Sequence, residues 1–460
     1  MTNLEKLDRF ILDKMTETKL PGLSLAAVKN GKTIYTRGYG LRDIAKGKPA
    51  TPDTLYCIGS VTKSFTCIAI MQLHEKGKLT VEDPVEKHLP LRLRSKGEPV
   101  RIRHLMSHTS GIPALAYVEA VIRHTMKSAD TYLPLATGQD MNTFLDEAEA
   151  WAHTRPGERW FYLNEGYRLL GEIIEKTSGE KYEDYVKRHI LQPLGMKRSV
   201  FSPEDVEADP DAATPYIVTR DGQQIPSTYA YGIVTSDGGL ISSANDMATY
   251  LKMLLGEGAA GETRVLSADS LREMKKPRIK TPDQPWITKT TRHYGYGLGI
   301  NTDPDGDVTV SHGGSVTTAT AQLAFAPENG VGVIVLANGT GYPLATIADY
   351  ALAALTEADP DQLPTIRFEN TLTDLEGNYE TYKHTMKARV TRRGSLLQLD
   401  TGDKYRDVTV PLIPLDWESP TKTFEGITGD RKQPAEFYKQ DGEQHLIYER
   451  YKFKRVGKNR

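Results

Sequence analysis

The chain has 460 residues, of which 38% are hydrophobic and 26% are charged, and its formal net charge is −2. This near-neutral balance gives no electrostatic basis for binding nucleic acid or an anionic membrane. No stretch approaches the roughly 20 apolar residues of a membrane span, and the N-terminal segment lacks the apolar core of a secretory signal. We therefore expect a cytoplasmic protein with no nucleic-acid or membrane partner, large enough for two or three domains, or for one large domain and a smaller one.

The first 77 residues predict a helix, a hairpin and a second helix. Two apolar runs flank Asn30-Gly31, which is a strong signal for a tight turn between antiparallel strands. A buried helix is expected from Ser60 to Gly77, since this stretch has little polar surface. In the N-terminal helix, the apolar residues at helical spacing are Leu4, Leu7, Ile11 and Met15.

Residues 100–200 are mainly helical in pattern, whereas residues 293–337 contain four strand signals and residues 343–355 a final helix. Strand signals therefore lie at both ends of this region, with helices between them. The pattern predicts an α+β fold, an α/β sandwich, in which an antiparallel sheet is flanked by helices and carries an inserted helical subdomain. We expect this unit to span residues 1–357.

A different pattern begins after a predicted linker at residues 358–364. Seven or eight short alternating segments, separated by turn residues, occupy residues 365–460. They predict a small antiparallel β-barrel. Two roles stay open for it: a ligand-binding barrel, or a module for oligomerisation or gating.

Ser60 and Lys63 form an S-x-x-K pattern at the start of the predicted helix. A serine at a helix N-terminus lies beside free amides and the positive end of the helix dipole, which favour a developing alkoxide. Lys63 returns to the same helix face and could accept the serine proton. The pattern also occurs at Ser178 and Ser419, but only Ser60 is followed by an apolar helix. Taken alone, the pattern fits an N-cap serine with a solvated lysine better.

A second candidate element is Tyr162-Leu163-Asn164, just before a helical pattern. Tyr162 could relay a proton between the nucleophile, the leaving group and Lys63, and Asn164 could bind the lysine and a substrate amide. Taken alone, an aromatic anchor followed by an Asn N-cap explains the pair better.

The third element, His312-Gly313-Gly314-Ser315, ends a predicted strand. Two glycines allow a ligand to approach the backbone closely. A main-chain amide here, together with that of Ser60, could form an oxyanion hole, with His312 beside the scissile bond. The alternative is an ordinary hairpin with a surface histidine.

A zinc site is a weaker hypothesis. His104 and His108 have the spacing of two ligands on one helix, but no third ligand is placed nearby in the sequence. We therefore expect neither a metal nor another cofactor.

In this order, the three elements resemble the serine β-lactamase and DD-peptidase superfamily. The Tyr-x-Asn and His-Gly-Gly forms are similar to its class C β-lactamase-related branch. With the C-terminal barrel, the chain is most similar to CubicO-type archaeal serine peptidases that carry a lipocalin-like domain. The resemblance covers about residues 5–357 and implies a homo-oligomer. It also implies a role for each of these residues: Ser60 as nucleophile, Lys63 as base, Tyr162 as proton relay, His312 as catalytic partner, and the Ser60 and Ser315 amides as oxyanion hole.

The expected function is that of a serine peptidase or hydrolase that cleaves short peptides, including peptides with D-residues, through a Ser60 acyl-enzyme. His312 replaces the lysine of the K-T-G motif, which should weaken binding of a substrate carboxylate, so high β-lactamase activity is not expected. Three alternatives stay open: an esterase, a weak β-lactamase, and a penicillin-binding sensor that acylates without turnover.

Overall fold

The computed structural model describes residues 2–125, 137–229, 231–232, 234–283, 287–356, 358–402, 408–429 and 431–458. The chain divides into two compact units. The first comprises Met1–Asp283 and Thr290–Ala358, and the second comprises Gln284–Lys289 and Asp359–Arg460.

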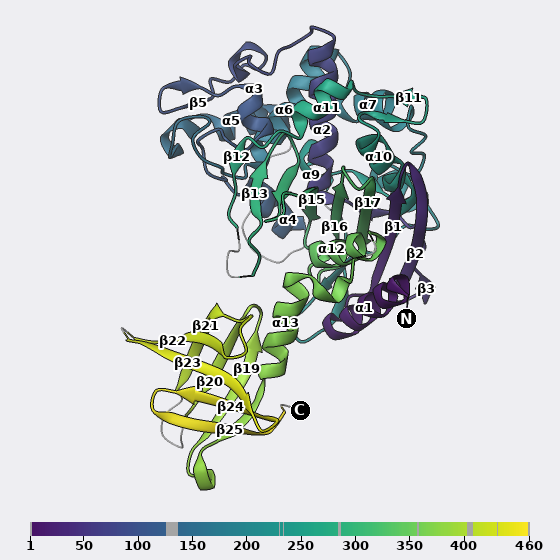
Figure 1. Ribbon diagram of the computed structural model, residues 1–460. Helices are drawn as coiled ribbons and strands as arrows, with labels where there is room; N and C mark the ends of the chain where they lie inside the picture. Colours follow the sequence, from purple (N-terminus) through teal and green to yellow (C-terminus); the bar gives the residue numbers. More distant parts are fainter. Residues whose placement is uncertain are drawn as a thin grey trace. The chain divides into compact units, whose positions relative to one another are not determined.

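The first unit is built on a nine-stranded sheet whose neighbours pair in antiparallel fashion (Figure 1). The predicted antiparallel sheet is thus confirmed, with the N-terminal hairpin paired to the last strand of the unit: Leu23 lies opposite Ala337. In sheet order the strands are β12 (Ile279–Lys280), β13 (Thr291–Tyr294), β14 (Gly299–Thr302), β15 (Val308–Ser315), β16 (Thr320–Ala326), β17 (Val331–Ala337), β1 (Gly22–Lys29), β2 (Lys32–Asp43) and β3 (Lys48–Pro49).

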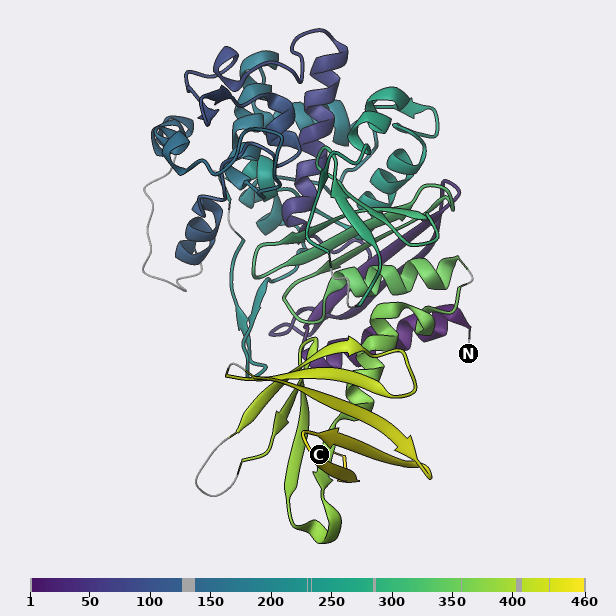
Figure 2. The same cartoon turned by 60° about the vertical axis from the view of Figure 1, so that its left-hand side comes forward.

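Helices cover the central strands on both faces. Every residue of β17 is buried, as is β1 except for its last residue, which is why both read as continuous apolar runs. On one face, α1 (Asn3–Thr18) packs beside α12 (Leu344–Leu355), with the Phe10 ring stacked on Tyr350 at 4.1 Å (Figure 2). On the other face, α10 (Ala244–Leu255) contacts β1 and β17.

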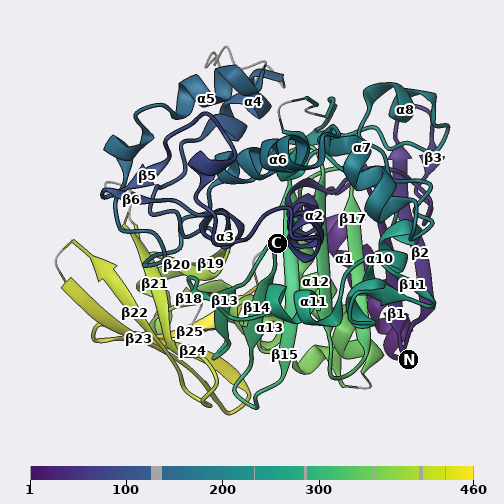
Figure 3. The same ribbon diagram turned by 90° about the horizontal axis from the view of Figure 1, so that it is seen from above.

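The helical part lies between the strands of the sheet in sequence, as predicted. Figure 3 shows α3 to α6 gathered on one side of α2, away from β1 and β2. Its main helices are α2 (Thr62–Glu75), α3 (Ile102–Met106), α4 (Tyr117–Thr125), α5 (Gly138–Leu145), α6 (Asn164–Ser178), α7 (Tyr182–Val186), α8 (Pro203–Ala208), α9 (Thr235–Gly238) and α11 (Ala268–Met274).

Eight strands form a closed antiparallel barrel in the second unit, which confirms the predicted small barrel (Figure 1). Inward side chains such as Val390, Leu412 and Phe437 fill its core. The strands are β18 (Gly377–Glu380), β19 (Lys387–Arg393), β20 (Leu396–Asp400), β21 (Thr409–Asp416), β22 (Lys422–Thr428), β23 (Arg431–Gln440), β24 (Glu443–Tyr448) and β25 (Tyr451–Gly457).

One sequence prediction needs correction. The predicted linker runs into a 3-10 turn (Pro360–Gln362) and then a helix, α13 (Pro364–Leu375), whose buried Phe368 and Leu372 join the barrel core. In α1, which has the predicted helical spacing, Leu7, Ile11 and Met15 are buried, whereas Leu4 in the first turn is exposed.

Among the described residues, no helix combines the length and the apolar character that crossing a bilayer would require.

Candidate active site

Ser60 lies in a tight turn directly before α2. The sequence predicted that the helix would start at Ser60, but a 3-10 turn (Gly59–Val61) comes first and α2 begins at Thr62. Gly59 has φ +52°, and a Cβ there would lie 2.8 Å from the main-chain nitrogen of Ser315. Glycine is therefore required by both the backbone conformation and the close approach of β15. This turn presents the Ser60 side chain to a cleft.

Lys63 is fully buried beneath that serine. Its Nζ donates to Ser60 Oγ at 3.2 Å and to the main-chain oxygen of Asp237 at 2.6 Å. It also lies 4.9 Å and 5.3 Å from the ring centroids of Tyr162 and Tyr167. The solvated lysine of the alternative interpretation is thus excluded, and the amine is held against the serine hydroxyl from several sides.

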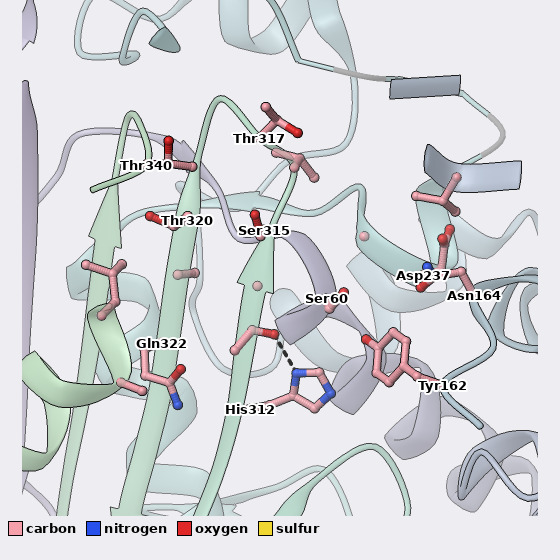
Figure 4. Close-up of a pocket in the computed structure, with 18 of the residues that line it drawn as sticks. Ser60, Tyr162, Asn164, Asp237, His312, Ser315, Thr317, Thr320, Gln322 and Thr340 are labelled. Atoms are coloured by element: carbon pink, nitrogen blue, oxygen red, sulfur yellow. Dashed lines mark hydrogen bonds between the residues drawn. The ribbon is translucent and has the colours of Figure 1, made fainter. Parts of the chain in front are cut away.

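Tyr162 and Asn164 approach the same point from the start of α6. Leu163 is the N-cap of α6 and makes no side-chain capping bond, so Asn164 is the first helical residue and not the N-cap. Figure 4 shows the Tyr162 ring beside Ser60, with Asn164 behind it. Both side chains line the cleft.

His312 on β15 is buried, with 7% of its surface exposed, and is therefore not a surface histidine. Its Nδ1 donates to the carbonyl oxygen of Gly313 at 2.7 Å, the bond drawn in Figure 4, and its Nε2 accepts from the hydroxyl of Tyr294 at 2.7 Å. Burial, with the Lys63 charge nearby, lowers the pKa of His312 to about 4. The imidazole is therefore neutral near pH 7, and both of its nitrogens are engaged.

The glycines of β15 bring the strand against the nucleophile turn. A Cβ on Gly314 would lie 1.9 Å from the Ile58 carbonyl oxygen and 3.1 Å from the Ser60 nitrogen. A Cβ on Gly313 would meet only the end of the Gln322 side chain, at 3.1 Å, and a main-chain oxygen at 4.0 Å. The amides of Ser60 and Ser315 are therefore brought close together, as an oxyanion hole requires.

A cleft of about 910 Å³ unites these groups. Seven of the eight residues that the sequence singled out line it, and Lys63 lies buried directly beneath. The residues that line it are Ser60, Tyr162, Asn164, His312, Gly313, Gly314 and Ser315.

Sequence reasoning missed two groups that hold the site together. Tyr294 on β13 binds His312, and Asp237 on α9 supplies a carbonyl to Lys63. Burial raises the pKa of the Asp237 carboxyl to about 7, although Lys63 opposes the shift. A main-chain carbonyl carries no side-chain signal, and Tyr294 stands in a strand pattern with other aromatic residues, so neither could be recognised from the sequence.

The zinc hypothesis for His104 and His108 is not supported by the structure. His104 lies on α3, but α3 ends at Met106, and His108 follows in a left-handed conformation with φ +56°. The His104 Nδ1 accepts the Arg101 amide, and the His108 Nδ1 accepts the Leu163 amide. Within the described ranges, no group of three or more His, Cys, Asp or Glu side chains is placed to hold a metal ion.

Comparison with known proteins places this architecture in a family. A family model described as Beta-lactamase matches residues 7–357, more than half of the chain. The chain belongs to the beta-lactamase family. In this beta-lactamase-family protein, residues 360–454 also match a model described as the Pab87 octamerisation domain.

Solved structures agree with this placement. The octameric penicillin-binding protein homologue from Pyrococcus abyssi is 43% identical with a TM-score of 0.92, over 98% of this chain and 100% of that one. A penicillin-binding protein from Bacillus halodurans is 27% identical with a TM-score of 0.61, over 75% of this chain and 99% of that one.

Curated relatives of this beta-lactamase-family protein are more distant. Protein flp of Staphylococcus aureus (strain MW2) is 27% identical over 73% of this chain, which spans 63% of the length of that protein. Esterase EstB of Burkholderia gladioli is 29% identical over 68% of this chain and 83% of that protein.

Proposed function

We propose that this chain is a serine peptidase that cleaves short peptides, including peptides with D-residues, through an acyl-enzyme on Ser60. The observation that carries the proposal is the 3.2 Å bond between Lys63 Nζ and Ser60 Oγ at the base of an open cleft. Nucleophile and base are in hydrogen-bond reach, and the base is oriented by a third group, the Asp237 carbonyl.

In the acylation step, Ser60 Oγ attacks the scissile carbonyl carbon while its proton passes to Lys63 Nζ, which has to enter this step as the free amine. The carbonyl oxygen becomes an oxyanion against the amides of Ser60 and Ser315, which the close approach at Gly314 brings together. Tyr162, whose ring lies beside Lys63, relays the proton to the leaving amine. Water then attacks the ester, and the same groups return the proton to Ser60 Oγ.

His312 enters this scheme as a neutral partner. Its Nδ1 and Nε2 are bound to Gly313 and Tyr294, and through these bonds it holds the end of β15 in place. It also gives the cleft floor beside Tyr162 a polar but uncharged surface. A neutral imidazole gives a substrate carboxylate no counter-charge, which supports peptide hydrolysis over strong β-lactamase activity. Four residues that line the cleft are the proposed substrate-binding positions: Asn164, Gly313, Gly314 and Ser315.

The first experiment is covalent labelling of the full chain with a fluorophosphonate or penicillin, followed by mass spectrometry and peptide mapping. One adduct on the peptide that contains Ser60 is expected, and Ser60→Ala should abolish it. Ser178→Ala is the matched control, because Ser178 has the same S-x-x-K spacing but lies at the end of α6. An adduct elsewhere, or turnover by the Ser60→Ala variant, would refute the assignment.

An esterase is the second candidate, favoured by the similarity to esterase EstB. Comparison of kcat/KM for matched ester and D-amino-acid amide substrates separates the two activities. A single stoichiometric burst without steady turnover would instead indicate a penicillin-binding sensor.

We propose that each compact unit is a domain and that the barrel drives assembly into a homo-octamer. The match to an octamerisation domain and the octameric homologue of 43% identity support this. Light scattering after gel filtration should give about eight times the chain mass, and a monomer at micromolar concentration would contradict it. The cytoplasm is the proposed compartment, since Cys57 and Cys67 are both free and buried.

A further inference from the structure

His108 belongs to no step of the proposed mechanism, although it lies next to the residues that carry it. It follows α3 and is fully buried. Its φ of +56° is uncommon for a residue other than glycine and is energetically unfavourable. A residue held in such a conformation is fixed by its surroundings, so the partners of its backbone and side chain indicate what it does.

Those partners are the two residues on either side of Tyr162. The carbonyl oxygen of His108 accepts the Phe161 amide at 2.8 Å, and its side-chain Nδ1 accepts the Leu163 amide at 3.0 Å. One histidine thus holds the backbone immediately before and immediately after the proposed proton relay. Leu163 is the N-cap of α6, and the His108 imidazole gives its buried amide a hydrogen-bond partner at the start of the helix.

The imidazole also packs on the tyrosine itself. Its centroid lies 4.0 Å from that of the Tyr162 ring, with 34° between the ring planes. On its other sides are Tyr167 at 4.9 Å and Tyr294 at 5.0 Å. The ring of Tyr162 is therefore supported on the His108 side while its other contacts include Lys63 and His312.

These contacts require a neutral imidazole of one tautomer. Because Nδ1 accepts the Leu163 amide, the ring proton is on Nε2, which is buried and has no hydrogen-bond partner among the described residues. Burial, with Lys63 and His312 nearby, holds the pKa of His108 well below its usual value. Near neutral pH the ring therefore remains an acceptor for the Leu163 amide.

We propose that His108 is a positioning residue that holds Tyr162 in place for proton transfer, through its Nδ1 bond to the Leu163 amide and its ring contact. The inference rests on the proposed role of Tyr162.

The test compares kcat and KM of the full-length protein on an activated ester or D-amino-acid amide, below the melting temperature of every variant. His108→Leu should lower kcat by about 10- to 100-fold and change KM by less than about threefold, since misplacement by about 1 Å costs on the order of 100-fold. His108→Asn should recover most of that loss, because its Oδ1 can occupy the place of Nδ1 and accept the Leu163 amide.

His104→Leu is the matched control. His104 is also buried, and its Nδ1 also accepts a main-chain amide, that of Arg101, three residues earlier in the chain. This variant should lower the melting temperature as much as His108→Leu does, with kcat within about twofold of wild type. If His108→Leu yields no folded protein, His108→Gln takes its place, since it moves the acceptor one bond farther out and should lose kcat likewise.

A double-mutant cycle with Tyr162→Phe decides between positioning and general destabilisation. If His108 acts through Tyr162, adding His108→Leu to Tyr162→Phe should cost less than about threefold more. Three results would overturn this inference and leave the proposed function standing. They are full additivity in the cycle, an unchanged kcat in His108→Leu, and a loss of kcat in His108→Asn or His104→Leu as large as that in His108→Leu. Wild-type kcat in Tyr162→Phe would instead refute the relay role in the proposed function, and the inference with it.

Discussion

Substitution of Gly314 by alanine should disable the site without unfolding the protein. The added Cβ would lie 1.9 Å from the Ile58 carbonyl oxygen and 2.9 Å from the Ile58 carbonyl carbon. Both are backbone atoms, so no side-chain rotation can relieve the contact. To restore even 3.0 Å to that oxygen, the shortest separation that real Cβ atoms show, β15 and the Ile58–Ser60 turn must part by about 1.1 Å.

A displacement of this size separates the Ser60 and Ser315 amides that are proposed to bind the oxyanion. Removing one oxyanion-hole donor costs about 100- to 1,000-fold in kcat, and a misplacement of about 1 Å costs on the order of 100-fold. We therefore expect Gly314→Ala to lower kcat by about 100-fold or more. Overpacking should cost about 1–3 kcal/mol of stability, small enough for the protein to stay folded at 25 °C.

Gly313→Ala is the natural control for this experiment. Its Cβ would meet the flexible end of Gln322 at 3.1 Å, which can move aside. Its effect should be confined to KM, since residue 313 lines the cleft. The measurements are kcat, KM and the melting temperature of both variants. Equal kcat in Gly314→Ala and Gly313→Ala would refute the claim that the approach of β15 to the turn sets the catalytic geometry.

Three further outcomes are expected. Lys63→Ala should lower kcat by 1,000-fold or more with the fold intact by circular dichroism, and a loss below tenfold would exclude Lys63 as the base. His312 should make the protein less stable in acid, because its pKa is about 4 in the folded protein and 6.5 in the unfolded chain. As the pH falls from 6.5 towards 4, the unfolded chain binds a proton at His312 before the folded protein does. The free energy of unfolding should therefore decrease by about 3 kcal/mol over this range. Urea unfolding at pH 7.5 and pH 5 should show a smaller difference in His312→Gln than in wild type, and an unchanged difference would refute this origin. Full activity should survive dialysis against a chelator, and loss that zinc restores would contradict the metal-free mechanism.

Much of the candidate site could be predicted because its signals, glycines and apolar periodicity, depend on residues that are close together in the sequence. Gly59 before an apolar helix and the pair at Gly313 and Gly314 marked the two segments that form the site. In the structure, backbone packs against backbone at Gly59 and Gly314, whereas Gly313 faces only a side-chain end at close range. The hairpin at Asn30-Gly31 was equally local.

Other features depend on partners that are distant in sequence. The group that binds Lys63 Nζ is a main-chain carbonyl on α9. Any residue type could supply this carbonyl, so the residue at position 237 gives no sequence signal for it. His108 suggested a metal ligand by its spacing, yet its backbone is left-handed and its imidazole binds the Leu163 amide, 55 residues away.

The helix α13 is a different kind of failure, because its signals were present. Pro364 occupies the first turn, where a missing amide costs nothing, and Phe368, Leu372 and Leu375 follow at helical spacing and are buried. The alternating pattern of the strands that follow is stronger, so this short amphipathic segment between two turns was not predicted to be a helix.

The pairing of Leu23 with Ala337 has a consequence for biosynthesis. At ribosomal speeds of about 5–20 residues per second, the more than 300 residues between these partners take roughly 15 to 60 seconds to be made. Throughout that interval the edge of β1 that will pair with β17 has no partner strand. The nascent chain must therefore be protected from pairing with other chains. The candidate site needs the Ser60 turn, the start of α6 and β15, so it can form only after the chain has been made as far as Ser315.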